Sequence, residues 1–287
     1  TWVEAGDAMP DDTDAVLRPD AVQQSGEARE AVASAQPGDG VLRSLPGGEE
    51  PLAQAGTMLR ALDIAALRGA GIREITVREP MLTVVSVNRQ TAAGDDTVSP
   101  LIAAAAEALG ARAHIVRASV AAGALENALR DGSADAVVTI GGTGEGRGDR
   151  AVAVTGGYGA VALHGMAIRR GETAALASVG ARPVLMLPGR LDAALAVWLL
   201  VGRPMIARLT GFSGTGRTFT APLTRKLVSS IGLADVAFVL LSAGGAEPLL
   251  FDGAPPHMLA AADGFVVIPP ESEGYPAGTV VEIGVLP

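Results

Sequence analysis

The fold of this chain is decided around Ala136-Val-Val-Thr-Ile-Gly-Gly-Thr-Gly-Glu-Gly-Arg-Gly-Asp149, where an apolar run passes directly into a glycine-rich loop. The uncharged run Ala136–Ile140 predicts a buried strand. A strand that ends in consecutive glycines leaves backbone N–H groups free to face a ligand, and such a loop can cradle phosphate or another oxyanion. In open α/β sheets ligands bind beyond the carboxyl ends of the strands, which is where this loop lies.

The pattern leaves two interpretations of the loop open. It can be a binding loop, in which Asp149 holds a divalent cation that bridges phosphates. It can equally be a tight structural turn whose glycines supply positive φ. A Walker loop is excluded because Gly-Lys-Ser/Thr is absent, and a Rossmann fingerprint fits poorly because no strand directly precedes Gly146-Arg147-Gly148.

Strands and helices alternate on both sides of the loop. Ser99-Pro100 predicts a helix start, with a hydroxyl at the N-cap and proline at the first helical position. The other predicted elements are strands at Leu82–Val87, Ala113–Val116, Val161–Ile168, Ala174–Val179 and Val184–Leu187, and helices over Leu101–Leu109, Leu125–Arg130 and Asp192–Leu209. This alternation predicts an α/β fold with a doubly wound parallel sheet.

Changes in composition divide the chain into four predicted domains. Residues 1–48 are expected to form a partial β-rich module with a strand at Ala15–Leu17, and 79–213 the α/β domain. Residues 49–78 are expected to link them as strand, helix and strand: Leu52–Leu59, Ile64–Gly69 and Ile72–Val77. After a linker at Gly211–Gly216, residues 214–287 are expected to form a small β-domain with strands at Phe238–Leu241, Pro248–Leu250, Phe265–Ile268 and Val280–Val285.

Composition excludes several classes of protein. The net charge is −9 without a basic stripe, which argues against nucleic-acid binding. Cysteine is absent, so disulfides, thiolate metal sites and a cysteine nucleophile are excluded, and three scattered histidines make a zinc site improbable. No long uncharged apolar run predicts a membrane span, and we expect a cytoplasmic protein. The chain begins at Thr1 rather than Met, so we expect a further segment before it.

Two further stretches are candidates for anion contacts. Leu187-Pro188-Gly189-Arg190 is a second strand-to-helix turn, where Arg190 could meet an anion at a helix start. Arg169-Arg170 at a strand end could clamp phosphate or molybdate bidentately. The plainer interpretations are a routine turn with a solvated arginine and a charged hairpin tip.

Taken in order, these stretches resemble the molybdopterin molybdotransferase family over nearly the whole chain. Glu4–Val16 is similar to its Thr-Gly-Ala-Pro-x-Pro-x-Gly-x-Asp-Ala-Val, and Val138–Asp149 lies where it has Ser-Gly-Gly-Val-Ser-x-Gly-Asp-x-Asp. His164–Pro188 lies where it has His-Gly-Val-x-x-Lys-Pro-Gly-Lys-Pro and then Leu-Pro-Gly-Asn-Pro. Gly141–Gly144 is also close to the Gly-Gly-Thr-Gly of the related adenylyltransferases. Further similarity is seen at Ala55-Gly56-Thr57 through Ile75, at Thr224-Arg225-Lys226 and from Ala262-Asp263-Gly264 through Glu273-Gly274.

The resemblance implies a multidomain, dimeric molybdenum-cofactor assembly protein. It implies a central domain that binds molybdopterin or its adenylylated form and inserts molybdate with Mg²⁺ present. Carried onto this chain, it implies catalytic roles for Asp149 and Asp14 and a metal site at Asp149. The implied cofactor-binding residues are Gly141, Gly142, Thr143, Gly144, Glu145, Arg169, Pro188, Gly189 and Arg190.

The chain also departs from the family pattern. Asn88-Arg89-Gln90 stands for Gly-Asp-Glu, Arg147 for the first loop aspartate, and Arg169 and Glu172 for two lysines. Exchanging carboxylates for arginines is expected to weaken metal binding and to strengthen binding of a bare anion.

Three hypotheses therefore stand: a molybdotransferase, a non-catalytic molybdopterin carrier or chaperone with a client molybdoenzyme or adenylyltransferase partner, and a nucleotide-binding α/β protein unrelated to molybdenum. A second carboxylate near Asp149, with Glu145 or a partner subunit's Asp14 as the candidate, would favour the first.

Overall fold

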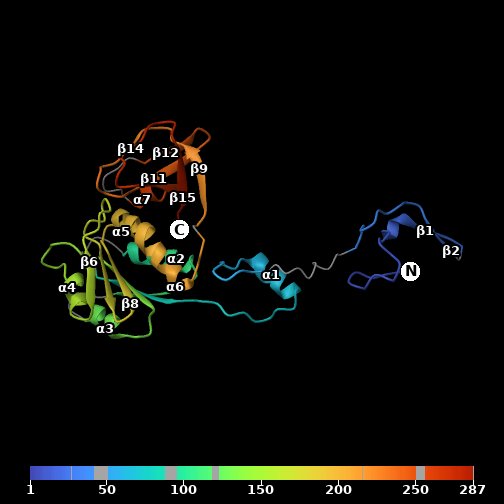
Figure 1. Cartoon of the computed structure of the whole chain (residues 1–287), viewed down its shortest axis with the longest axis horizontal. Helices are drawn as coiled ribbons and strands as arrows, with labels where there is room; N and C mark the ends of the chain where they lie inside the picture. The colour runs from blue at the N-terminus through green and yellow to red at the C-terminus, as the bar shows by residue number, and fades with distance from the viewer. Residues whose placement is uncertain are drawn as a thin grey trace. The chain divides into compact units, whose positions relative to one another are not determined.

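The computed structural model describes residues 1–26, 28–41, 51–87, 96–117, 123–214, 216–249 and 256–286 (Figure 1). The chain divides into two compact units, Thr1–Leu52 and Ala53–Pro287, and each is described by itself. The domain boundary expected at residues 48 and 49 lies outside the described residues, and so does Asn88-Arg89-Gln90.

The first unit contains one short antiparallel hairpin. A 3-10 turn over Pro19–Ala21 (η1) leads into β1 (Val22–Ser25), which pairs with β2 (Ala28–Ala31). The strand expected at Ala15–Leu17 is wrong, because Val16 instead donates its backbone N–H to the carbonyl of Asp39 at 2.8 Å within a loop. The hairpin strands are almost entirely exposed, so no alternation of buried apolar residues marks them in the sequence.

The second unit opens with a single helix, α1 (Ala61–Gly69). The strands expected at Leu52–Leu59 and Ile72–Val77 do not form in this part of the structure. Their apolar side chains are exposed, for example 49% for Ile75 and 62% for Val77. An apolar run without a neighbouring strand has no partner for its backbone groups, so it does not become a strand.

A six-stranded sheet, in which Figure 1 labels β6 and β8, forms the centre of this unit. Its strand order is β4-β3-β5-β8-β7-β6. β3, β4, β5 and β8 are parallel, which confirms the α/β fold. The strands are β3 (Met81–Ser86), β4 (Arg112–Arg117), β5 (Ala136–Ile140), β6 (Ala160–His164), β7 (Ala175–Val179) and β8 (Arg182–Leu187).

The expectation of a wholly parallel sheet is wrong at one edge. β7 runs antiparallel to both β8 and β6. Only Gly180 and Ala181 separate β7 from β8, whereas a parallel pair needs a crossover of about a dozen residues or more. Between β6 and β7 there is likewise no helix to carry the chain back.

Helices cover both faces of the sheet. α2 (Val98–Glu107) and α5 (Leu191–Val197) lie on one face, where they pack on Val138 and Ile140. α3 (Ala124–Arg130) and α4 (Ala151–Gly156) lie on the other face with Val137. Because successive side chains of a strand point to opposite faces, the uncharged run of β5 supplies both cores at once.

The helix expected at Asp192–Leu209 is present but interrupted. α5 passes through a π-helical turn, η2 (Trp198–Gly202), into α6 (Arg203–Thr210), with Pro204 in the first turn of α6. Proline cannot donate to the preceding turn, so the hydrogen-bond ladder shifts there. The whole stretch Leu191–Thr210 is long and apolar enough to cross a membrane, but half of its most apolar window is buried inside the fold. Its packing in the core identifies it as a core helix.

The C-terminal part is a β-domain, drawn orange to red in Figure 1. Its five-stranded antiparallel sheet has the order β12-β11-β13-β15-β9, and β10 pairs separately with β14. The elements are β9 (Thr218–Pro222), β10 (Leu227–Val228), β11 (Asp235–Ser242), β12 (Gly245–Pro248), α7 (Pro256–Leu259), β13 (Gly264–Ile268), β14 (Gly274–Tyr275) and β15 (Val280–Val285). Phe238 and Phe265 of this domain share a core cluster with Trp198, so the two sheets are joined through α5 and η2.

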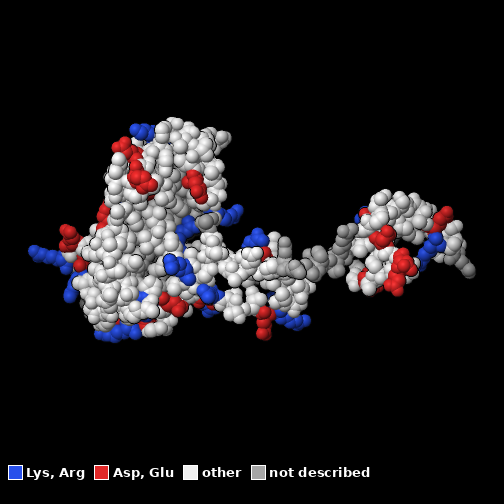
Figure 2. Space-filling view, in the orientation of Figure 1, with Lys and Arg blue, Asp and Glu red and all other residues white. Residues whose placement is uncertain are grey.

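Charged side chains of both signs are interspersed over the face shown in Figure 2, and no continuous basic stripe is seen among the described residues there.

Candidate functional site

The glycine loop lies at the point where the strand order of the sheet reverses. β3 is followed by β4 on one side, and the chain then returns to place β5 on the other side of β3. The loop after β5 is held between its neighbours by two backbone bonds, from Val87 to Ile140 at 2.9 Å and from Gly141 to Leu187 at 2.8 Å. Ligands of open α/β sheets bind at such a reversal, beyond the carboxyl ends of the strands.

Two consecutive glycines give the loop its path. Gly141 and Gly142 have φ values of 85° and 70°, a region that other residues avoid. A Cβ on Gly142 would lie 3.2 Å from the Cβ of Ala151 and 3.3 Å from Cγ1 of Val87. The carbonyl of Gly142 accepts the N–H of Ala151 at 3.0 Å, which ties the loop to the start of α4. The glycines therefore have a structural role whether or not a ligand binds.

The backbone amides that follow have no hydrogen-bond partner among the residues that the structure describes. Among the described residues, none accepts a hydrogen bond from the N–H of Gly142, Thr143, Gly144 or Glu145. Thr143 is only 3% exposed, so its amide lies where a missing partner is costly. A row of unpaired amides at this position is suited to an anionic ligand.

Asp149 closes the loop. Its Oδ2 accepts the N–H of Gly146 at 2.9 Å, and its own N–H donates to the carbonyl of Gly146 at 2.8 Å. Across the described part of the chain, no group of three or more His, Asp or Glu side chains gathers to hold a metal ion. Asp149 thus has a structural task, and a cation at its carboxylate would need its other ligands from substrate and water.

Thr143 connects the loop to the neighbouring turn. Its hydroxyl lies 3.1 Å from the hydroxyl of Thr173, and its carbonyl lies 3.1 Å from Nε2 of His164. His164 ends β6, and Thr173 lies between β6 and β7. The structure therefore brings the glycine loop together with the segment that carries Arg169.

Arg169 itself is directed to a carboxylate of the C-terminal domain. Its Nη1 lies 3.5 Å from Oδ2 of Asp235, and Nη2 of Arg170 lies 2.8 Å from Oδ1 of the same residue. Ser229 donates its hydroxyl to Asp235 at 3.1 Å. The side chain of Asp235 is 6% exposed, so this charge cluster is a joint between domains. Arg169 as a cofactor contact stays a prediction, because its guanidinium already has a protein partner.

The turn after β8 supplies a further edge of the site. Pro188 is buried, whereas Gly189 and Arg190 are exposed. Arg190 pairs with Asp192 at the start of α5, with Nη2 2.7 Å from Oδ2. Its role as an anion contact also stays a prediction.

One polar group at the same end of the sheet was not anticipated from the sequence. Asp96 precedes α2, and its Oδ1 accepts the N–H of Ser99 at 3.0 Å. Partial burial raises the pKa of Asp96, but hydrogen bonds from Ser99 and Ser86 outweigh it and leave the pKa below its usual value. Ser86 ends β3 beside Ile140, so this carboxylate belongs to the strand reversal. Asp95-Asp96 before Ser99-Pro100 is the sequence signal that could have found it.

Asp14 lies in the first unit, where its carbonyl accepts the N–H of Gly38 at 2.7 Å. The glycine loop belongs to the second unit, so the catalytic role of Asp14 stays a prediction.

Two family models match the chain in succession. Residues 83–208 match the "Probable molybdopterin binding domain", and residues 220–286 match the "MoeA C-terminal region (domain IV)". The first covers the six-stranded sheet and the glycine loop, and the second covers the C-terminal β-domain.

Solved structures and a curated relative agree with these matches. The molybdopterin biosynthesis MoeA protein of Pyrococcus horikoshii has a TM-score of 0.71 and 25% identity, over 96% of this chain and 72% of that one. A further structure, of a molybdopterin biosynthesis MoeA protein from Pyrococcus horikoshii OT3, has a TM-score of 0.72 and 19% identity, over 98% of this chain and 73% of that one. A Methanocaldococcus jannaschii protein named for molybdopterin biosynthesis is 30% identical over 165 residues, which are 57% of this chain and 39% of the relative. The match thus spans well under half of that relative's length.

Fold, loop and matches together define a molybdopterin-binding α/β domain followed by a MoeA-type β-domain. The chain is a MoeA-like member of the molybdenum cofactor biosynthesis family.

Proposed function

We propose that the chain binds molybdopterin, in its adenylylated form, at the glycine loop and inserts molybdate into the dithiolene. The observation that carries the proposal is the row of amides from Gly142 to Glu145 at the strand reversal, for which the described part of the chain offers no acceptor. A phosphate group would accept these N–H groups and relieve the cost of leaving the buried amide of Thr143 without a partner. The family membership supports molybdopterin as the molecule that carries the phosphate.

The neighbouring residues have distinct roles in this proposal. Asp149 holds the loop closed through Gly146 and offers a carboxylate to Mg²⁺, whose other ligands are substrate phosphates and water. Asp96 is a second carboxylate at the strand reversal. Molybdate is the substrate: as the two dithiolene sulfurs bind molybdenum, the two thiol protons leave with one molybdate oxygen as one water, and molybdenum keeps its oxidation state. Arg190 and Arg169 supply positive charge at the rim of the site.

The assembly and location are proposed in the same way. We infer a cytoplasmic homodimer, in which Asp14 of one copy could complete the site of the other. Sedimentation of the full chain tests the dimer. A mixed dimer of an Asp14→Ala copy with an Asp149→Ala copy tests the shared site, because one of its two sites would regain both carboxylates.

Two substitutions at Asp149 separate its structural task from metal binding. The amide introduced by Asp149→Asn keeps an oxygen for the Gly146 N–H but loses the negative charge, whereas Asp149→Ala loses both. We expect wild-type binding of adenylylated molybdopterin to tighten with Mg²⁺, Asp149→Asn to bind without a response to Mg²⁺, and Asp149→Ala to bind at least about tenfold more weakly.

Other outcomes redirect the proposal. Tight binding that ignores Mg²⁺ and both substitutions would identify a carrier instead of a transferase. Absence of binding to wild type would overturn the assignment of the loop.

A further inference from the structure

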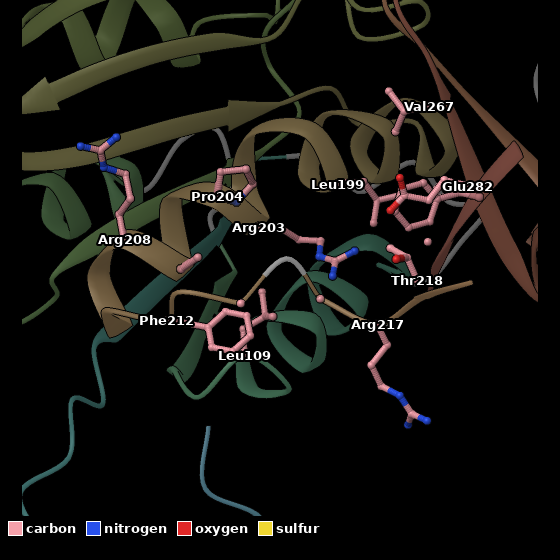
Figure 3. A pocket seen from close by; sticks show the side chains of 15 residues that line it. Leu109, Leu199, Arg203, Pro204, Arg208, Phe212, Arg217, Thr218, Val267 and Glu282 are labelled. Carbon is pink, nitrogen blue, oxygen red and sulfur yellow. The ribbon is translucent and has the colours of Figure 1, made fainter. Parts of the chain in front are cut away.

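A separate cavity of about 600 Å³ lies between α6 and the C-terminal sheet (Figure 3). None of its lining residues belongs to the glycine loop or to the turn after β8. Its volume is within the range of sites for small organic ligands. Apolar side chains form much of its wall: Leu109, Leu199, Phe212, Phe265 and Val267.

Arg203 is one of four charged residues that line this cavity, with Arg208, Arg217 and Glu282, and the side chains of Arg208 and Arg217 extend away from it in Figure 3. Figure 3 shows the Arg203 side chain directed into the space between α6 and Thr218, and its guanidinium carbon lies 5.9 Å from the centre of the Phe265 ring. No carboxylate lies within 4.0 Å of it in the part of the chain that the structure describes. Burial alone lowers the pKa of Arg203 below its usual value, as expected for a cation without a counter-charge.

The Phe265 ring is only a weak partner for this half-buried cation, which lacks a carboxylate among the described residues. An anionic ligand would supply the missing negative charge. The planar guanidinium presents paired N–H groups that match a carboxylate or a sulfonate. The surrounding rings and aliphatic side chains would receive an apolar body. Glu282 also lines the cavity, and its carboxylate disfavours a ligand with a second negative charge.

We propose that this cavity is a second binding site, which takes a small aromatic acid with a single negative charge. The acid group pairs with Arg203, and the ring lies against Phe265 and Phe212. The inference does not depend on molybdopterin binding at the glycine loop, because the two sites share no residue.

The experiment uses the full chain and the fluorescent monoanion 1-anilinonaphthalene-8-sulfonate as the probe. Titrations follow the rise in probe fluorescence for wild type, Arg203→Gln and Arg208→Gln. Arg208 is a matched control, because it lines the same cavity yet its side chain extends away from Arg203 in Figure 3. We expect one probe molecule per chain, a loss of affinity of about tenfold in Arg203→Gln, and a change below about twofold in Arg208→Gln.

A variant that binds the probe more tightly distinguishes loss of the site from loss of the fold. Glu282→Gln removes the repelling carboxylate and should tighten binding about threefold, which a damaged fold would not do. Sodium phosphate at the same concentration should not displace the probe, because it has no apolar body. Equal affinity in wild type and Arg203→Gln, binding of several probe molecules, or displacement by phosphate alone would each overturn the proposal. An Asp149→Ala control should bind the probe normally, so failure here and failure at the glycine loop can be told apart.

Discussion

The guanidinium of Arg170 donates to Oδ1 of Asp235 at 2.8 Å and links the α/β domain to the C-terminal β-domain. The same Arg170 Nη2 donates to the carbonyl of Val236 at 2.7 Å. Both side chains are nearly buried, 11% exposed for Arg170 and 6% for Asp235. Next to this pair, Ile168 forms a parallel β-bridge with Ala234. Backbone pairing and an ion pair therefore connect the two domains at the same place.

Asp235→Asn should destabilise the protein strongly, because it leaves two arginines without their shared counter-charge. Breaking a buried ion pair in this way costs about 3–5 kcal/mol. Urea unfolding followed by circular dichroism would measure the change. Glu247→Gln is the control, because its pair with Arg225 is exposed and worth at most about 1 kcal/mol. Equal effects of the two substitutions would contradict the assignment of Asp235 as the joint.

Gly142→Ala should reduce ligand binding as well as stability. A positive φ costs a residue with a Cβ about 1–2 kcal/mol, and here the added methyl also presses on Ala151 and Val87. Gly180→Ala is the matched control, since Gly180 has a φ of 62° but open space around its Cβ position. Thermal unfolding should detect both substitutions, whereas calorimetric titration with molybdopterin should detect only Gly142→Ala. Equal ligand affinity in both variants would argue that the loop is a structural turn alone.

Low pH should destabilise the N-terminus of α1, because protonation of Asp63 weakens its hydrogen bonds with Arg60. The side-chain hydrogen bond from Arg60, together with its backbone N–H, lowers the pKa of Asp63 from 3.8 to about 2. A lowered carboxyl pKa means that Asp63 supports the folded helix above its unfolded pKa of 3.8, and this support is lost as the pH falls through about 2. The nuclear magnetic resonance chemical shifts of the Asp63 carboxyl and the Arg60 amide should change with pH together, with one shared midpoint. A midpoint near 3.8 would show that the cap does not form in solution.

Gly202→Ala should disturb the core at the π-helical turn. A Cβ at Gly202 would lie 2.2 Å from Cε3 of Trp198, which is fully buried. Overpacking of this kind costs about 1–3 kcal/mol, and the fluorescence of Trp198 should change with it. Gly69→Ala, at the open end of α1, should instead be neutral or stabilising by up to about 1 kcal/mol. Comparable destabilisation by both would contradict close packing at Gly202.

The sequence predicted the buried strands of the central sheet to within a few residues, and it placed the Val280–Val285 strand correctly. Uncharged β-branched runs mark such strands because both faces are covered. The direction of β7 and β6 was missed, since periodicity carries no information on direction. The expected N-cap at Ser99 was also wrong: α2 begins at Val98, and the carboxylate of Asp96 takes the capping role instead.

The candidate site was predicted in part. The glycine loop could be located because consecutive glycines directly follow a buried strand, but this pattern is equally compatible with a structural turn. The partners of Arg169 could not be predicted, because Asp235 lies in a different domain and no local pattern connects them. Asp96 was missed for a similar reason, since its importance comes from β3 and β5 ending side by side.

The core cluster shared by Trp198, Phe238 and Phe265 has a consequence for how the second unit denatures. Removing the β-domain after Gly214 would leave η2 with its apolar side chains in water, as well as two arginines without Asp235. Residues 53–286 should therefore melt in a single calorimetric transition, and the α/β domain expressed alone should aggregate instead of refolding.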